Sequence, residues 1–102
     1  RMTVNEYAAW RRDQTPHFLL DVRQPEEYEA ARLEGSVLIP LSELPGRLAE
    51  LPKGLPLVVL CHHGMRSAHA VHHLREAGFD ALNLSGGIDA WSREIDEKVP
   101  VY

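Results

Sequence analysis

The stretch LVVLCHHGMRS, residues 57–67, determines the fold and the chemistry expected of this chain. Residues 57–60 form a continuous apolar run, which is typical of a strand buried on both faces of a parallel sheet. Cys61 follows at once, Gly64 permits a tight turn, and a helical pattern begins at Ser67 and runs to residue 77. Ligands of open parallel sheets bind where the strands end. The stretch therefore predicts a cysteine in a strand-to-helix loop at the ligand-binding edge.

The loop of residues 61–67 has features that stabilise a sulfur anion. A free cysteine is largely a thiol at pH 7 and becomes a good nucleophile only when it ionises. Backbone amides that curl around Cys61 would form an anion-binding nest, and the following helix adds the positive end of its dipole. The amides expected to line this nest are those of His62, His63, Gly64, Met65, Arg66 and Ser67. Such a nest suits a thiolate, or a persulfide one atom further out; the alternative is an inert buried cysteine.

Short apolar runs alternate with helical patterns along the rest of the chain. The sequence predicts strands over residues 18–22, 37–40, 55–60 and 81–84. It predicts helices over residues 6–12 after a cap at Thr3 or Asn5, and over 25–31, 42–51, 67–77 and 88–96. This alternation predicts an α/β fold, a central parallel β-sheet with helices on both faces in three layers. We expect residues 1–102 to form one domain.

Composition excludes several function classes. The net charge of −4 provides no basic field for nucleic acid, and we expect no nucleic-acid partner. No window approaches the roughly 18 consecutive apolar residues of a membrane helix, and residues 1–6 lack the apolar core of a signal peptide. One cysteine cannot form an internal disulfide, so we expect a cytoplasmic protein with a free thiol and no membrane partner.

Three separated motifs resemble those of a single rhodanese domain. Residues 61–66 match the family's CxxGxR loop, residues 20–28 match its DVRxPxEY segment, and residues 84–91 match its LxGGxxAW segment. The resemblance implies a sulfurtransferase whose catalytic Cys61 carries a sulfane sulfur as a persulfide, with no cofactor and no metal. It implies thiosulfate or a protein persulfide as donor, and cyanide, a dithiol or a sulfur-carrier protein as acceptor. Residues 31–36, ARLEGS, depart from the family's Gly-His-Ile-x-Gly-Ala stretch and lack its histidine.

Two other functions are compatible with the same fold. One is an interaction or regulatory module that keeps the loop without turning over sulfur. The other is a phosphatase or an arsenate reductase, whose loops carry one more residue between cysteine and arginine. Four residues separate Cys61 from Arg66 here, and the tighter loop favours a terminal sulfur atom over a phosphate. The closing residues 86–102 are also similar to rhodanese domains found with the adenylating enzymes of sulfur-carrier proteins, which suggests such an enzyme or carrier as partner.

Several residues outside the loop are candidates for a supporting or binding role. Asp21 and Arg23 flank Val22, so their side chains leave the strand on one side, and we expect a hydrogen bond or ion pair that supports the loop. His69, His72 and His73 share one helical face, where a solvated surface is the simpler interpretation and a metal site the alternative. Residues 99–102 are expected to lie along the surface.

Overall fold

Four short strands form one parallel sheet in the computed structural model, which describes all residues, 1–102. The strands lie in the order β2, β1, β3, β4. Their bounds are β1 Phe18–Asp21, β2 Val37–Leu38, β3 Leu57–Leu60 and β4 Ala81–Asn83. Asp21 of β1 is in register with Leu60 of β3, so the residues that follow both strands emerge together at the carboxyl edge. The predicted parallel sheet is confirmed.

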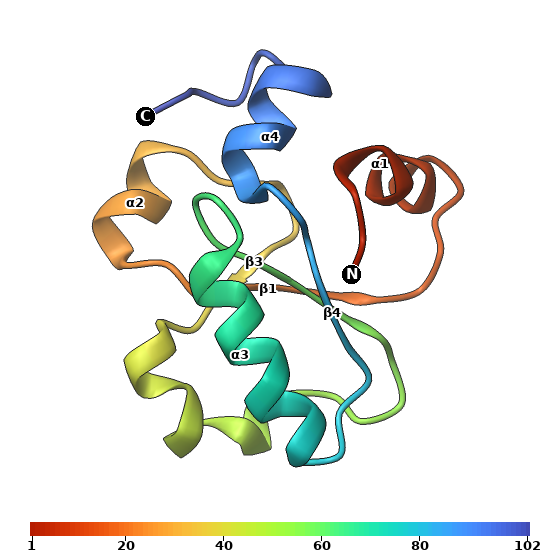
Figure 1. Cartoon of the computed structure of the whole chain (residues 1–102), viewed down its shortest axis with the longest axis vertical. Coiled ribbons are helices and arrows are strands. Elements are labelled where there is room, and N and C mark those ends of the chain that lie inside the picture. Colours follow the sequence, from red (N-terminus) through yellow and green to blue (C-terminus); the bar gives the residue numbers. More distant parts are fainter.

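Helices cover both faces of the sheet (Figure 1). Helices α1 (Val4–Arg12) and α4 (Gly87–Glu94) lie on one side, and α3 (Met65–Glu76) lies on the other. Two buried clusters reflect these layers: the first includes Tyr7, Ile88 and Trp91, and the second includes Leu44, Ala70, Val71 and Leu74. The three-layer α/β architecture predicted from the sequence is therefore confirmed.

Local capping signals explain where the helices begin and end. Thr3 caps α1 with its side chain and forms a reciprocal capping box with Glu6. Pro25 occupies the first turn of α2 (Pro25–Ala30), where its missing N–H costs nothing. Gly78 follows α3 with a positive φ of 91°, as expected of a residue that ends a helix. No helix has the length and apolar composition needed to cross a membrane.

The predicted α-helix over residues 42–51 is wrong. The segment instead forms two 3₁₀ helices, η1 (Leu41–Gly46) and η2 (Leu48–Glu50). Pro45 has no N–H to donate within a helix and Gly46 disfavours helical backbone, so a continuous α-helix is interrupted there. Leu44 and Leu51 are nevertheless buried, because a 3₁₀ turn also returns apolar side chains to one side.

Several boundaries also differ from prediction by one or two residues, among them those of α3 and β3. Helix α3 begins at Met65 and not at Ser67, so Arg66 belongs to its first turn. Residues 55–56 lie outside β3. The first difference affects the site, because the loop after Cys61 is only three residues long before the helix begins.

Candidate active site

Cys61 lies in the loop between β3 and α3, and its sulfur is surrounded by donors. Only 1% of the residue is exposed. The backbone N–H of Gly64 donates to Sγ over 3.1 Å and that of Ser67 over 3.4 Å. The Ser67 hydroxyl oxygen lies 3.3 Å from Sγ. These groups and the positive end of α3 all favour negative charge on the sulfur.

Further donors remain free in the same loop. The backbone N–H groups of Met65 and Arg66, in the first turn of α3, have no backbone acceptor, as expected of the first residues of a helix. The N–H groups of His62 and His63 have none either. The loop can therefore offer additional hydrogen bonds to an anion that extends beyond Sγ.

Gly64 makes the tight turn possible. Its φ of 105° lies in the left-handed region, which glycine adopts without steric strain. A Cβ at this position would lie 3.2 Å from the backbone nitrogen of Gly86. The turn thus requires glycine both for its backbone conformation and for the close approach of the loop before α4.

Helix α4 holds the other side of the loop. The backbone N–H of Ile88 donates to the Cys61 carbonyl over 2.9 Å, and that of Asp89 donates to the His62 carbonyl over 3.0 Å. Gly87 lies so close to these carbonyls that a Cβ would overlap them. The GG pair of the LSGGIDAW motif therefore lets the amino end of α4 dock directly on the cysteine loop.

Asp21 and Arg23 form the expected ion pair at the carboxyl end of β1. Both side chains are fully buried, and Arg23 Nη2 lies 2.6 Å from Asp21 Oδ2. Arg23 Nε also donates to both carboxylate oxygens. The same guanidinium donates to the carbonyl of Ala31. The pair therefore braces the segment after β1, beside the end of β3 that carries Cys61.

Arg66 turns toward α2 and pairs with Glu27. Its Nη1 and Nη2 donate to the two carboxylate oxygens over 2.7 and 2.9 Å. These hydrogen bonds lower the pKa of Glu27 from 4.5 to about 2. The Arg66 side chain keeps 37% of its surface exposed, so the Arg66–Glu27 pair lies at the rim of the loop. Sequence inspection singled out Arg66 but missed Glu27, which the DVRxPxEY match had contained.

We expect the ion pair between Glu27 and Arg66 to make a pH-dependent contribution to stability. Glu27→Gln is expected to lower the free energy of unfolding at pH 7 by about 1 kcal/mol, because the pair with Arg66 is partly exposed. Since the pKa is lowered in the folded protein, the contribution is complete above pH 4.5 and is lost as the pH falls toward 2. Urea unfolding of both proteins across this range measures the difference. Glu29→Gln, on the exposed side of α2, is the matched control, and an unchanging difference at every pH would contradict the assignment.

Tyr102 connects the cysteine loop with α2 and with the segment after β1. Its hydroxyl accepts from Arg23 Nη1 and donates to Glu27 Oε2, each over 2.8 Å. Its ring stacks on His62 with centroids 3.9 Å apart and planes 6° from parallel. Burial, the largest influence, raises the pKa of Tyr102 to about 12. The tail lies on the surface as predicted, with Tyr102 40% exposed, but no sequence pattern indicated that it contacts the site.

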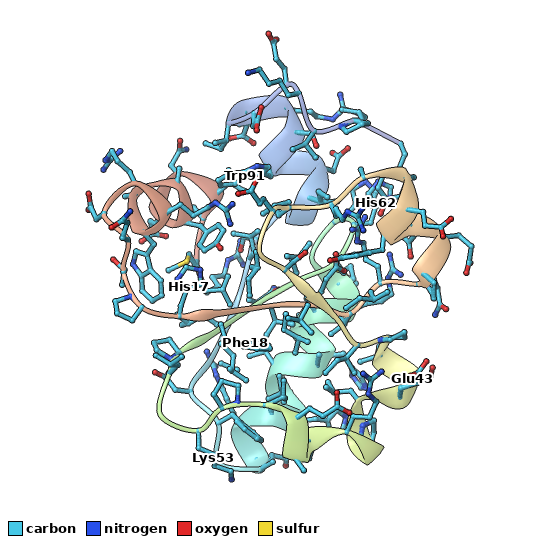
Figure 2. All side chains as sticks on the ribbon, turned by 180° about the vertical axis from the view of Figure 1, so that it is seen from behind. His17, Phe18, Glu43, Lys53, His62 and Trp91 are labelled. Carbon is cyan, nitrogen blue, oxygen red and sulfur yellow. The ribbon has the colours of Figure 1, made fainter.

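His62 and His63 project from the loop toward the tail and α4. His62 Nε2 lies 2.9 Å from the Tyr102 carbonyl oxygen, and Figure 2 shows the side chain beside α2. Ligand atoms of His62, His63 and Asp89 lie within 4.8 Å of one another and could approach a metal ion. However, Arg93 Nε donates to both carboxylate oxygens of Asp89, which opposes binding of a cation.

The histidine-rich face of α3 lies on the surface. His69, His72 and His73 are exposed, and the Nε2 atoms of His69 and His73 are 3.2 Å apart. Only these two of the three approach each other so closely. The exposed face agrees with the simpler interpretation made from the sequence.

Comparison with known proteins identifies the family. A model of the rhodanese-like domain matches residues 3–94. The chain belongs to the rhodanese-like domain family. The rhodanese-like domain protein from Staphylococcus aureus has a similar structure, with a TM-score of 0.87 and 31% identity over 99% of this chain and 96% of that one.

Relatives among curated proteins are longer. The Zea mays protein "Adenylyltransferase and sulfurtransferase MOCS3-1" is 42% identical over 110 residues, which cover 100% of this chain and 24% of the relative. The Mycobacterium tuberculosis protein "Probable adenylyltransferase/sulfurtransferase MoeZ" is 36% identical over 104 residues, which cover 99% of this chain and 26% of the relative. This rhodanese-like domain therefore spans about a quarter of the length of these relatives.

Proposed function

We propose that this rhodanese-like domain is a sulfurtransferase that carries a sulfane sulfur on Cys61. The observation that carries the proposal is the set of donors around Sγ, from Gly64 and Ser67, at the carboxyl edge of the sheet. These donors favour the thiolate, which is the nucleophilic form. The free N–H groups of Met65 and Arg66 supply hydrogen bonds for the outer sulfur of a persulfide.

The proposed reaction has two displacement steps. The Cys61 thiolate attacks the sulfane sulfur of thiosulfate, a new S–S bond forms, and sulfite leaves with the electron pair of the broken bond. A nucleophilic acceptor then attacks the outer sulfur of the persulfide, and Sγ departs as the thiolate. Arg66 lies at the rim where an anionic donor approaches, and Glu27 balances its charge there. The proposed setting is the cytoplasm, where a free thiol stays reduced.

The proposed physiological acceptor is a sulfur-carrier protein, delivered by an adenylating enzyme. Support comes from relatives whose names combine adenylyltransferase and sulfurtransferase. Cyanide or a dithiol would serve as a small-molecule acceptor in vitro. A protein persulfide is the alternative donor to thiosulfate.

Sulfur loading can be tested by intact-protein mass spectrometry. Incubation with thiosulfate is expected to add about 32 Da to the wild-type chain, and subsequent cyanide is expected to remove it. Cys61→Ser is expected to gain no mass, because the chain has no other cysteine. A wild-type chain that never gains this mass from thiosulfate or from a protein persulfide would overturn the proposal and favour a binding module.

A further inference from the structure

Asn83, the last residue of β4, contacts the cysteine loop through both ends of its side-chain amide. Nδ2 donates to the Gly64 carbonyl over 3.2 Å, and Oδ1 lies 2.5 Å from the Ser67 hydroxyl. A carbonyl oxygen only accepts, so the atom facing Gly64 is the NH₂ group and the atom facing Ser67 is the amide oxygen. It follows that the Ser67 hydroxyl donates its proton to Asn83.

The Ser67 hydroxyl has one proton and two neighbours that can accept it. One is Asn83 Oδ1 at 2.5 Å, and the other is Cys61 Sγ at 3.3 Å. When Cys61 is a thiol, its S–H can donate to Ser67 Oγ while the hydroxyl donates to Asn83. When Cys61 is a thiolate, the sulfur has no proton, and Ser67 can stabilise it only by turning its own proton away from Asn83.

We propose that Asn83 is a positioning residue that controls where the Ser67 proton points during sulfur transfer. The thiol and the persulfide leave Sγ uncharged, and in these states Ser67 donates to Asn83. The thiolate draws the proton to Sγ, because a hydrogen bond to a charged acceptor is stronger than one to an amide oxygen. The relevance of this exchange to turnover rests on the proposed function. The exchange itself requires only that Cys61 changes between thiol and thiolate.

The exchange supports both displacement steps. In the loading step, the Ser67 hydroxyl first donates to the nucleophilic thiolate. When the new S–S bond removes the charge from Sγ, the hydroxyl donates to Asn83 again. In the transfer step, the electron pair of the breaking S–S bond remains on Sγ, and Ser67 turns back to donate to the leaving thiolate. Asn83 Nδ2 meanwhile keeps the Gly64 peptide in place, so that only the hydroxyl needs to rotate.

The experiment compares alkylation of Cys61 by iodoacetamide in the full chain across a range of pH. The thiolate displaces iodide and forms a C–S bond, so the pH of the half-maximal rate reports how readily the thiol ionises. Ser67→Ala is expected to slow alkylation at pH 7 about tenfold, because the thiolate loses a donor. Asn83→Ala is expected to accelerate alkylation at pH 7 about threefold, because Asn83 Oδ1 no longer competes with Sγ for the Ser67 proton.

The double variant Ser67→Ala/Asn83→Ala makes the test specific. It is expected to match Ser67→Ala alone, because the Gly64 carbonyl still accepts from the backbone N–H of Ala68 when Asn83 is removed, and the remaining effect of Asn83 on the sulfur passes through Ser67. Other titratable or charged groups near the loop can also shift the pH profile, and they stay the same in every variant. They are His62 and His63 in the loop, Arg66 in α3, Glu27 in α2, Asp89 in α4 and Tyr102 in the tail. A general loosening of the loop would instead slow alkylation in both single variants.

Two results would overturn the inference. One is slower alkylation in Asn83→Ala than in the wild type, and the other is a double variant that differs from Ser67→Ala. Asn83→Leu, which fills more of the volume without an acceptor, must give the same acceleration as Asn83→Ala, and it replaces that variant if alanine prevents folding. Alkylation requires only the thiol, whereas sulfur loading requires persulfide formation. The two measurements therefore separate a failure of this inference from a failure of the proposed sulfurtransferase activity.

Discussion

Asp21→Ala is expected to lower the free energy of unfolding by about 3–5 kcal/mol, because it leaves the Arg23 charge buried without its partner. Both side chains are fully buried. The remaining partners of the guanidinium are carbonyl oxygens and the Tyr102 hydroxyl, none of which carries a compensating charge. A loss of this size is a large fraction of the stability of a domain of this length.

Urea unfolding, followed by tryptophan fluorescence, measures the loss. Asp13→Ala is the matched control, because that carboxylate is 65% exposed and its contact with Arg12 is 3.5 Å long. The control is expected to change stability by less than about 1 kcal/mol. The double variant Asp21→Leu/Arg23→Met, which buries no charge, is expected to recover part of the loss. A cost for Asp21→Ala no greater than that of the control would show that the buried pair does not stabilise the fold.

The contacts that could be predicted from the sequence are those between neighbours in the chain. Cys61, Gly64 and Ser67 lie within one strand-turn-helix unit, so the backbone path that brings their amides to the sulfur follows from local conformation. Asp21 and Arg23 are two residues apart, and the alternation of a strand places them on one side. Local geometry was therefore enough to predict the cysteine loop and the buried pair of Asp21 and Arg23.

The contacts that were missed join residues distant in the chain. Tyr102 reaches Glu27 across 75 residues and Arg23 across 79, and no periodic pattern marks such an encounter. Asn83 lay within the strand predicted over residues 81–84, but its approach to Ser67 depends on how β4 lies beside β3. The contacts of these residues depend on the order of the strands in the sheet, which brings the strand ends and the tail to the same edge. They can therefore be recognised only from the three-dimensional structure.

The predicted helix over residues 42–51 failed for a different reason. The leucines of this segment recur at helical spacing; Leu44 and Leu51 are in the core, and the partly buried Leu48 packs against it. However, apolar spacing does not distinguish an α-helix from successive 3₁₀ turns, and Pro45 with Gly46 favoured the turns. The pattern thus predicted which side chains are buried better than it predicted the backbone that buries them.

Gly87 is the residue at which the fold and the site depend most directly on each other. It has a φ of 61°, and a Cβ there would overlap the carbonyl groups of Cys61 and His62. These are backbone atoms, which cannot move aside as the end of a flexible side chain can. The next two residues of α4 donate hydrogen bonds to the same two carbonyls, so displacing α4 would break both bonds.

Gly87→Ala is therefore expected to lower the free energy of unfolding by about 3 kcal/mol or more, through backbone strain and overpacking together. It is also expected to slow sulfur loading of Cys61 more than about tenfold, since small displacements of reacting groups are costly. Gly35→Ala is the matched control: its φ of 85° is also positive, but a Cβ there has no neighbour within 4 Å. The control is expected to lose about 1 kcal/mol from strain and to load sulfur normally. If Gly87→Ala behaves like Gly35→Ala in both measurements, α4 does not hold the cysteine loop in its active geometry.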